Sequence, residues 1–314
     1  MNKAKFQQII SQIPQFTHFQ RIFFLLRLKN IDDYQKTCDI IESRIESNKT
    51  CPHCSSSHFN KHGFQSGLQR YRCKSCGKTF NSLTNTNLAR LRKKDLWLEY
   101  SNCIIDTKSI RKSSKKLNIS TSTAFRWRHR MLATSQSSEP QSLSGIIEAD
   151  DTFFLESQKG QKKLNRPARK RGGTSKKRGL SKDQVSVLVA CDRAGKEADY
   201  ITGFGPTTGD WLTNNFSEHI EKDAILITDS APSFHKFCSE KHIEHIRINT
   251  TKGHRVKGVF HIQNVNSYHS LIKNWIRRFR GVATKYLANY LGWCNELNKR
   301  KINEPSIILK IAIN

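Results

Sequence analysis

The pattern of apolar and polar positions divides the chain into a helical N-terminal part and a C-terminal part in which strands and helices alternate. Apolar residues recur with helical spacing before residue 48, which predicts two or three short helices there. A stretch rich in Ser, Gln, Glu and Pro at 135–144 predicts a linker. The expected segments are helices at 1–48, a cysteine module at 49–82, a helical module at 90–134, a domain at 145–300 and a tail at 301–314.

In the C-terminal domain, short apolar runs predict strands and longer amphipathic runs predict helices. The expected strands are 146–154, 184–192, 198–204, 224–229 and 243–249, and the expected helices are 209–221, 232–240 and 264–280. Three successive strands followed by alternating helices and strands predict a mixed sheet with flanking helices. This is the element order of the ribonuclease-H-like fold, so the predicted class is α/β.

The first predicted strand contains three carboxylates, Glu148, Asp150 and Asp151, in an apolar run. Buried carboxylates are costly unless they are paired or bind a metal ion. A later strand ends in Asp229, at the edge where ligands gather in open α/β sheets. If the first strand is central, Asp150 and Asp229 lie side by side, and their repulsion favours a bound divalent cation. Two Mg²⁺ ions about 3.5–4 Å apart at such acids support phosphoryl transfer.

The last long helix supplies a third group for this site. Asn266 and Lys273 are seven residues apart, about two turns, so they share one face, and Arg277 lies on the same polar stripe. An amide oxygen can thus reach the metal ions while the lysine meets a phosphate. Because Asn266 is neutral, Glu148 or Glu296 is an alternative third ligand. Taken alone, Asn266 is also typical of a helix cap.

The charge balance predicts a polyanionic partner. The chain has 54 Lys+Arg and 26 Asp+Glu, a net charge of +28, which favours nucleic acid over a membrane. The expected partner is double-stranded DNA. Eleven Lys+Arg and no acid occur at 159–182, where we expect a DNA clamp that stays mobile until DNA orders it. The alternative is a solvated loop. The DNA-contacting residues expected there are Arg169, Lys170, Arg171, Lys176, Lys177 and Arg178.

The cysteines and the helical module predict two further DNA-associated parts. Cys51, Cys54, Cys73 and Cys76 form two C-x2-C pairs eighteen residues apart, which predicts a zinc ribbon with one structural Zn²⁺. Residues 107–130 hold eight Lys+Arg and no acid, and their pattern predicts a helix-turn-helix. An ordinary basic helical hairpin is the alternative. The side chains expected in the major groove are Ser122, Thr123, Arg126 and Arg130.

The N-terminus lacks a secretory signal pattern, and its longest apolar run, Ile22–Leu26, is far too short to span a bilayer. The scattered cysteines are typical of free thiols in a cytosolic chain. We therefore expect a cytoplasmic, nucleoid-associated protein with no membrane partner.

At the acidic motifs the chain resembles insertion-sequence transposases of the ISXO-like type, which have an N-terminal zinc ribbon and an integrase-like catalytic core. The motifs are E-A-D-D-T around Asp150, I-T-D-S-A around Asp229, and H-I-Q-N-V-N-S-Y-H-S-L-I-K with Asn266 and Lys273. The resemblance implies an Asp-Asp-Asn-Lys site with two Mg²⁺ ions. It also implies cleavage of the element's ends, strand transfer into target DNA, and a homodimer or larger synaptic assembly.

Asn266 stands where many relatives have Glu. The alternative function is therefore a non-catalytic regulator that binds DNA through the zinc ribbon and helix-turn-helix, or an inactive transposase copy.

Overall fold

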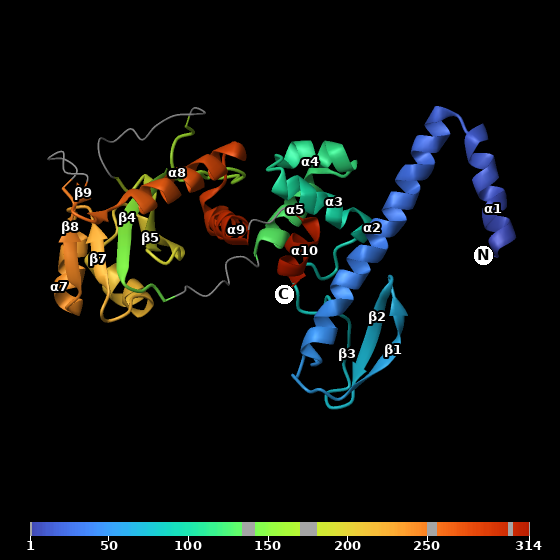
Figure 1. The fold of residues 1–314 in the computed structure, drawn as a ribbon, viewed down its shortest axis with the longest axis horizontal. Coiled ribbons are helices and arrows are strands. Elements are labelled where there is room, and N and C mark those ends of the chain that lie inside the picture. The colour runs from blue at the N-terminus through green and yellow to red at the C-terminus, as the bar shows by residue number, and fades with distance from the viewer. Residues whose placement is uncertain (1, 134–141, 170–180, 250–255, 301–303, 314) are drawn as a thin grey trace. The chain divides into compact units, whose positions relative to one another are not determined.

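The computed structural model describes most of the chain. The described ranges are residues 2–133, 142–169, 181–249, 256–300 and 304–313. Contacts group the chain into two compact units, one formed by residues 1–134 with 302–314 and the other by residues 135–301. Figure 1 shows the helices and strands of both units, coloured along the chain. Of the helices in the described ranges, none is both long enough and apolar enough to cross a membrane.

The first unit combines helices with a small antiparallel sheet of order β1-β2-β3. Its elements are α1 (Lys3–Gln12), α2 (His18–Asn48), β1 (Phe59–Gln65), β2 (Leu68–Cys73), β3 (Thr79–Phe80), α3 (Trp97–Ile105), α4 (Ile110–Leu117), α5 (Thr121–Leu132) and α10 (Pro305–Ile313). The three strands lie within the expected cysteine module. Residues 305–313 were expected to be part of a tail, but α10 buries its apolar side chains in this unit.

Helix α2 differs from the expectation of two or three short helices before residue 48, because it runs for 31 residues. Thr17 and Gln20 form a capping box at its N-terminus, in which each side chain accepts a hydrogen bond from the other residue's backbone N–H. Residues 18–48 contain no Gly or Pro, so nothing in the sequence breaks the helix.

The C-terminal half of α2 packs on the small sheet. Glu42 Oε1 accepts a hydrogen bond from the Gln69 N–H at 2.8 Å, and Arg44 Nη1 donates to the Ser82 carbonyl at 3.0 Å. The buried side chains of α2 are Thr37, Cys38, Ile41 and Ile45. All of them lie in this half, so the sheet and the second half of α2 form one packed body.

Helices α4 and α5 are joined by a tight turn, as the sequence predicts. Asn118 ends α4 in the left-handed conformation, with φ of 49°. Ser120 then caps α5 by accepting a hydrogen bond from the Thr123 N–H at 3.1 Å. Trp127 of α5 packs edge-on against Tyr100 of α3, with 5.3 Å between ring centroids. The pair is therefore fixed to α3.

The second unit is built on a mixed five-stranded sheet of order β6-β5-β4-β7-β8. Its elements are β4 (Ile146–Leu155), β5 (Gln184–Asp192), β6 (Glu197–Phe204), α6 (Gly209–Trp211), β7 (Ile225–Thr228), α7 (Pro232–Lys241), β8 (Glu244–Arg247), β9 (Val256–Lys257), β10 (Phe260–His261), α8 (Gln263–Arg278) and α9 (Leu287–Arg300). β4 pairs antiparallel with β5 and parallel with β7. This topology confirms the expected ribonuclease-H-like fold class.

One predicted helix of this unit, 209–221, is instead a series of short turns. α6 covers three residues and is followed by a π turn at Leu212–Phe216 and a 3-10 turn at Ser217–His219. The sequence L-T-N-N-F-S is rich in Thr, Asn and Ser, whose side chains compete for backbone hydrogen bonds and weaken a regular helix.

The alternation of side chains along β4 separates its residues onto two faces of the sheet. Ile147 and Ala149 are buried in the apolar core with Phe216 and Phe237, on the side of α7. Glu148 and Asp150 therefore face the opposite side, which α8 covers. This period of two places two carboxylates between the sheet and one helix.

Candidate active site

Four cysteine sulfurs converge beside the small sheet of the first unit. The Sγ atoms of Cys51, Cys54, Cys73 and Cys76 all lie within 4.8 Å of one another. The Sγ–Sγ distances are 3.8 Å for Cys51–Cys76 and 3.6 Å for Cys54–Cys73. Four sulfurs about 2.3 Å from one tetrahedral ion lie about 3.8 Å apart, so the cluster fits a metal ion. No histidine in the described ranges belongs to the cluster.

Asp150 and Asp229 are level with each other on adjacent parallel strands. Ala149 of β4 pairs with Thr228 of β7, and the two aspartates are the next residues of each chain segment. Adjacent strands lie about 4.8 Å apart. The alternation of side chains along each strand puts both aspartates on the face of the sheet that α8 covers, so their carboxylates lie close together. Asp229 Oδ1 also accepts a hydrogen bond from the Ala231 N–H at 3.0 Å.

The environment of this pair opposes two full negative charges. Burial and then the charge of Asp229 raise the pKa of Asp150 to about 7. A hydrogen bond from the Asp151 N–H, at 2.8 Å, and the charge of Lys273 act in the opposite direction. A cation that binds between the carboxylates would favour their ionised forms. Adjacent carboxylate oxygens are also the ligands that Mg²⁺ prefers, so the pair fits a divalent ion.

Glu148 joins β4 to the first turn of α8. Its side chain is fully buried. Oε2 accepts hydrogen bonds from the backbone N–H groups of Asn264 at 2.8 Å and Val265 at 3.3 Å, and Oε1 accepts one from the Asn264 side chain at 2.8 Å. Oε1 also lies 3.1 Å from Arg193 Nη2 and 3.3 Å from His261 Nδ1. The carboxylate thus caps α8 and is engaged by protein donors, so we assign it to holding α8 in place of the alternative metal-ligand role.

A second contact fixes the next turn of α8 beside Asp150. The Asp150 backbone lies close enough to the His269 ring to act on its pKa. Burial, followed by the charge of Lys273, lowers the pKa of His269 to about 4, so the ring is neutral at physiological pH. The step from Glu148 to Asp150 along β4 is about 6.6 Å, and the step from Asn264 to His269 along α8 is about 7.5 Å. Because these lengths are similar, α8 runs alongside β4 from Glu148 to Asp150.

This alignment places Asn266 between the two anchored turns. His269 is three residues and Lys273 seven residues beyond Asn266, so all three lie on one flank of the helix. Asn266 and Lys273 are exposed, whereas His269 is buried. Lys273 is close enough to lower the pKa of Asp150. The flank that carries Asn266 therefore includes Lys273, a residue that lies close to Asp150.

Asp151 belongs to the other face of the sheet. Its Oδ1 accepts a hydrogen bond from the Thr207 hydroxyl at 2.7 Å, and its Oδ2 accepts one from the Thr207 N–H at 3.2 Å. These contacts tie the loop before α6 to β4. Asp151 is thereby separated from Asp150 although the two are consecutive.

The family model of the ISXO2-like transposase domain matches residues 142–295, which include β4, β7, α8 and the residues just described. Residues 142–295 are an ISXO2-like transposase domain. This result confirms the resemblance seen in the acidic motifs.

One relative of this chain comes from a transposable element. An uncharacterized protein in transposable element ISH50 of Halobacterium salinarum is 27% identical over 246 residues, covering 77% of this chain and 82% of the relative. A pre-cleavage Mos1 transpososome is 11% identical, covers 63% of this chain and 77% of that chain, and has a TM-score of 0.21. The Mos1 strand transfer complex is 11% identical, covers 63% and 75%, and has a TM-score of 0.23.

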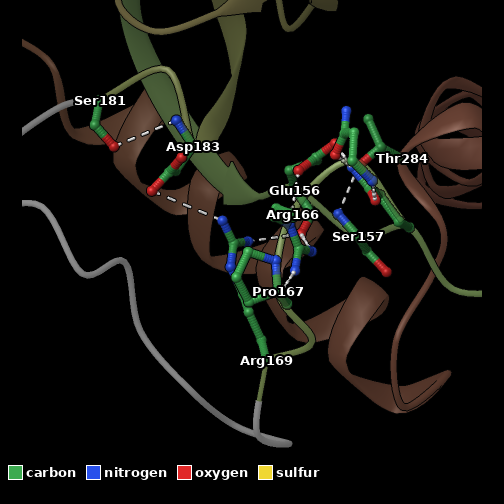
Figure 2. A network of polar contacts seen from close by, with 10 residues as sticks. Glu156, Ser157, Arg166, Pro167, Arg169, Ser181, Asp183 and Thr284 are labelled. Atoms are coloured by element: carbon green, nitrogen blue, oxygen red, sulfur yellow. Dashed lines mark hydrogen bonds and ion pairs between the residues drawn. The ribbon is translucent and has the colours of Figure 1, made fainter. Parts of the chain in front are cut away.

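In the transposase domain, the first part of the basic loop at 159–182 is attached to Glu156. Arg166 Nε donates to Glu156 Oε2 at 3.0 Å, and Arg169 Nη1 donates to the Glu156 carbonyl at 2.9 Å. Arg169 also lies 3.8 Å from Asp183, and Figure 2 shows these contacts converging. The described part of the loop is thus attached to the end of β4, and the DNA clamp stays a prediction. Lys170, Arg171, Lys176, Lys177 and Arg178 lie outside the described residues.

The remaining predicted DNA contacts lie on helices. On α5, Arg126 is exposed, and Arg130 Nη1 donates to the Ala89 carbonyl at 2.8 Å. The Ser122 and Thr123 hydroxyls lie 2.9 and 2.8 Å from Ser120 Oγ. Arg277 of the transposase domain is exposed on α8. DNA contacts by these residues stay predictions.

Sequence reasoning missed the residues that hold α8 in the transposase domain. His269 carries a visible signal, because it shares the flank of Asn266 and Lys273. Arg193 and His261 carry none, because they reach Glu148 from separate elements.

Proposed function

We propose that this protein is a transposase that cuts the ends of its insertion sequence and joins the freed ends to target DNA. The observation that carries the proposal is the pair of level aspartates, Asp150 and Asp229, facing the flank of α8 that bears Asn266 and Lys273. The transposase domain supplies the reaction class, and the arrangement of these four residues supports the Asp-Asp-Asn-Lys assignment.

In this proposal Asp150, Asp229 and the amide oxygen of Asn266 hold two Mg²⁺ ions. When bound, such ions activate the attacking hydroxyl and stabilise the leaving oxygen of an in-line displacement at phosphorus. Lys273 holds a phosphate of the DNA backbone beside the aspartates. Glu148 and His269 keep α8 at the distance that lets Asn266 reach the same ions. The protein therefore contributes positioning and charge neutralisation.

The first unit and the basic loop are proposed to bind duplex DNA. The net charge of +28 favours phosphate contacts of any sequence, and each contact adds about −0.9 to the salt slope of binding. The exposed Arg126 of α5 is suited to reading base edges in a major groove. We also propose that the protein acts as a homodimer or larger assembly, which brings two element ends together.

The four-cysteine cluster is proposed to bind one structural Zn²⁺. Cys51 and Cys73 are packed with Ile45, Phe59 and Phe80 in one small core, so loss of the ion should unfold the sheet. We expect Cys73→Ser to bind no zinc and to lose the ribbon's protection from proteolysis. His53→Ala, beside the cluster, should keep one zinc per chain. Metal analysis and limited proteolysis measure both, and full zinc content in Cys73→Ser would contradict the assignment.

The stabilising effect of Mg²⁺ should depend on pH. The pKa of Asp150, about 7, lies above its ordinary value of 3.8. Its neutral form therefore stabilises the metal-free fold below about pH 4, and this contribution is lost as the pH rises through about 7. We expect Mg²⁺ to raise the melting temperature clearly at pH 8 and hardly at pH 5. In Asp150→Asn, the change in melting temperature caused by Mg²⁺ should be the same at both pH values. Equal changes at pH 5 and pH 8 in the wild type would contradict the prediction.

The decisive test of function is cleavage of DNA that carries the element's terminal repeats. The purified full chain with Mg²⁺ is expected to nick these ends and to join them to a target plasmid. Tight binding of the repeats without any nicking would instead favour the regulator or an inactive copy.

A further inference from the structure

The first half of α2 exposes an unusual amount of apolar surface. Between residues 18 and 28, six large side chains are at least 44% exposed, namely Phe19, Ile22, Phe23, Leu25, Leu26 and Leu28. Helix α1 adds Phe6, Ile9 and Ile10, which share one face and are also exposed. Figure 1 shows α1 and this half of α2 extending away from the other elements of the first unit. We call these nine side chains the N-terminal apolar surface.

This surface surrounds α2. Leu28 is nine residues after Phe19, about two and a half turns, so the two lie on opposite sides of the helix. A helix that is apolar all round is normally buried by several neighbours. Helices in water also owe most of their stability to such packing. α1 can cover one side of α2, which leaves the other side for a helix from elsewhere.

We propose that a second copy of this chain covers the N-terminal apolar surface, so that α1 and the first half of α2 from two copies form a four-helix bundle. A large side chain presents roughly 150–250 Å², and the exposed fractions of these nine add up to about five whole side chains, so the surface of one copy amounts to about 1,000 Å². A stable interface needs about 800 Å² from each partner. The surface is therefore large enough for a specific dimer, and it does not depend on the transposase assignment.

The charges near the N-terminal apolar surface favour a second copy of the chain over a lipid surface as the partner. Residues 2–31 carry five Lys+Arg and no acid. A helix that lies on a membrane keeps its polar and apolar residues on opposite faces. In α2, Arg21 and Arg27 stand on different sides, among the apolar residues. In a dimer these like charges repel, so association should strengthen as salt screens them.

The test is the mass of the full chain in solution, free of nucleic acid, by sedimentation equilibrium. We expect a dimer at micromolar concentration. Its dissociation constant should decrease when the salt concentration is raised from 0.15 to 0.5 M. Phe19→Glu with Leu26→Glu should raise the dissociation constant at least about 100-fold, because two charges from each copy would be buried in the dimer interface. Phe64→Glu, which changes a side chain 75% exposed on β1, should leave it unchanged.

Three outcomes would overturn the proposal. The first is a monomer at every concentration, which would show that no second copy covers the surface. The second is a dimer that the double variant does not weaken. The third is a monomer that sediments with vesicles of anionic phospholipid, which would assign the surface to a membrane. Circular dichroism of the double variant, expected to match the wild type, shows that the exposed changes leave the fold intact.

Discussion

Asp150→Asn and Asp229→Asn proteins should bind the element's terminal repeats at least as tightly as the wild type and cut them at least about 10³-fold more slowly. Each change keeps the shape of the side chain and removes one charged oxygen ligand. Metal ions contribute several kcal/mol of charge stabilisation in phosphoryl transfer, and about 4 kcal/mol corresponds to 10³ in rate. Binding should survive because neither aspartate is among the proposed DNA contacts, which lie on α5, on the basic loop and at Lys273 and Arg277 of α8.

Single-turnover cleavage of labelled repeats with Mg²⁺, together with fluorescence anisotropy for binding, measures this prediction. Asp210→Asn is the matched control, because that carboxylate is 78% exposed and pairs with Lys236 on the surface. It should cleave at the wild-type rate. If both active-site variants cleave at wild-type rates, the active site lies elsewhere in the protein.

Glu148→Gln should destabilise the protein by about 3–5 kcal/mol and slow cleavage about 10–100-fold even where the protein is fully folded. A glutamine places an NH₂ group against either the α8 N–H groups or the Arg193 and His261 donors, since both carboxylate oxygens accept hydrogen bonds. Arg193 also loses its buried counter-charge. Displacement of α8 moves Asn266 away from the aspartates, so the loss should appear in the rate of the chemical step.

Two variants separate this positioning role from stability alone. Glu148→Asp keeps the charge but is one methylene too short to reach α8, so it should also cleave slowly. Glu221→Gln, an exposed acid in the same unit, should change neither stability nor rate. Urea unfolding and single-turnover rates at low temperature measure both effects. A Glu148→Gln protein that melts early but cleaves normally when folded would show that Glu148 does not position the site.

Much of the site could be predicted from the sequence because its signals are local. The spacing of Cys51, Cys54, Cys73 and Cys76 predicts a metal site whatever the rest of the chain does. The apolar run around Asp150 and the strand before Asp229 predict two strands, and the order of the elements predicts that these strands are neighbours. The shared flank of Asn266 and Lys273 follows from the helical repeat alone.

The tertiary structure decided what each buried charge contacts. Glu148 and Asp150 have the same parity on β4, and the sequence left Glu148 as an alternative metal ligand, yet Glu148 caps a helix 116 residues away. Likewise, the acid that attaches the basic loop is Glu156, and the residues after 304 close the first unit. Helical and strand periods depend on residues a few positions apart, so the sequence by itself determines them. The partner of a buried carboxylate depends on register and packing between distant elements, which only the folded chain establishes.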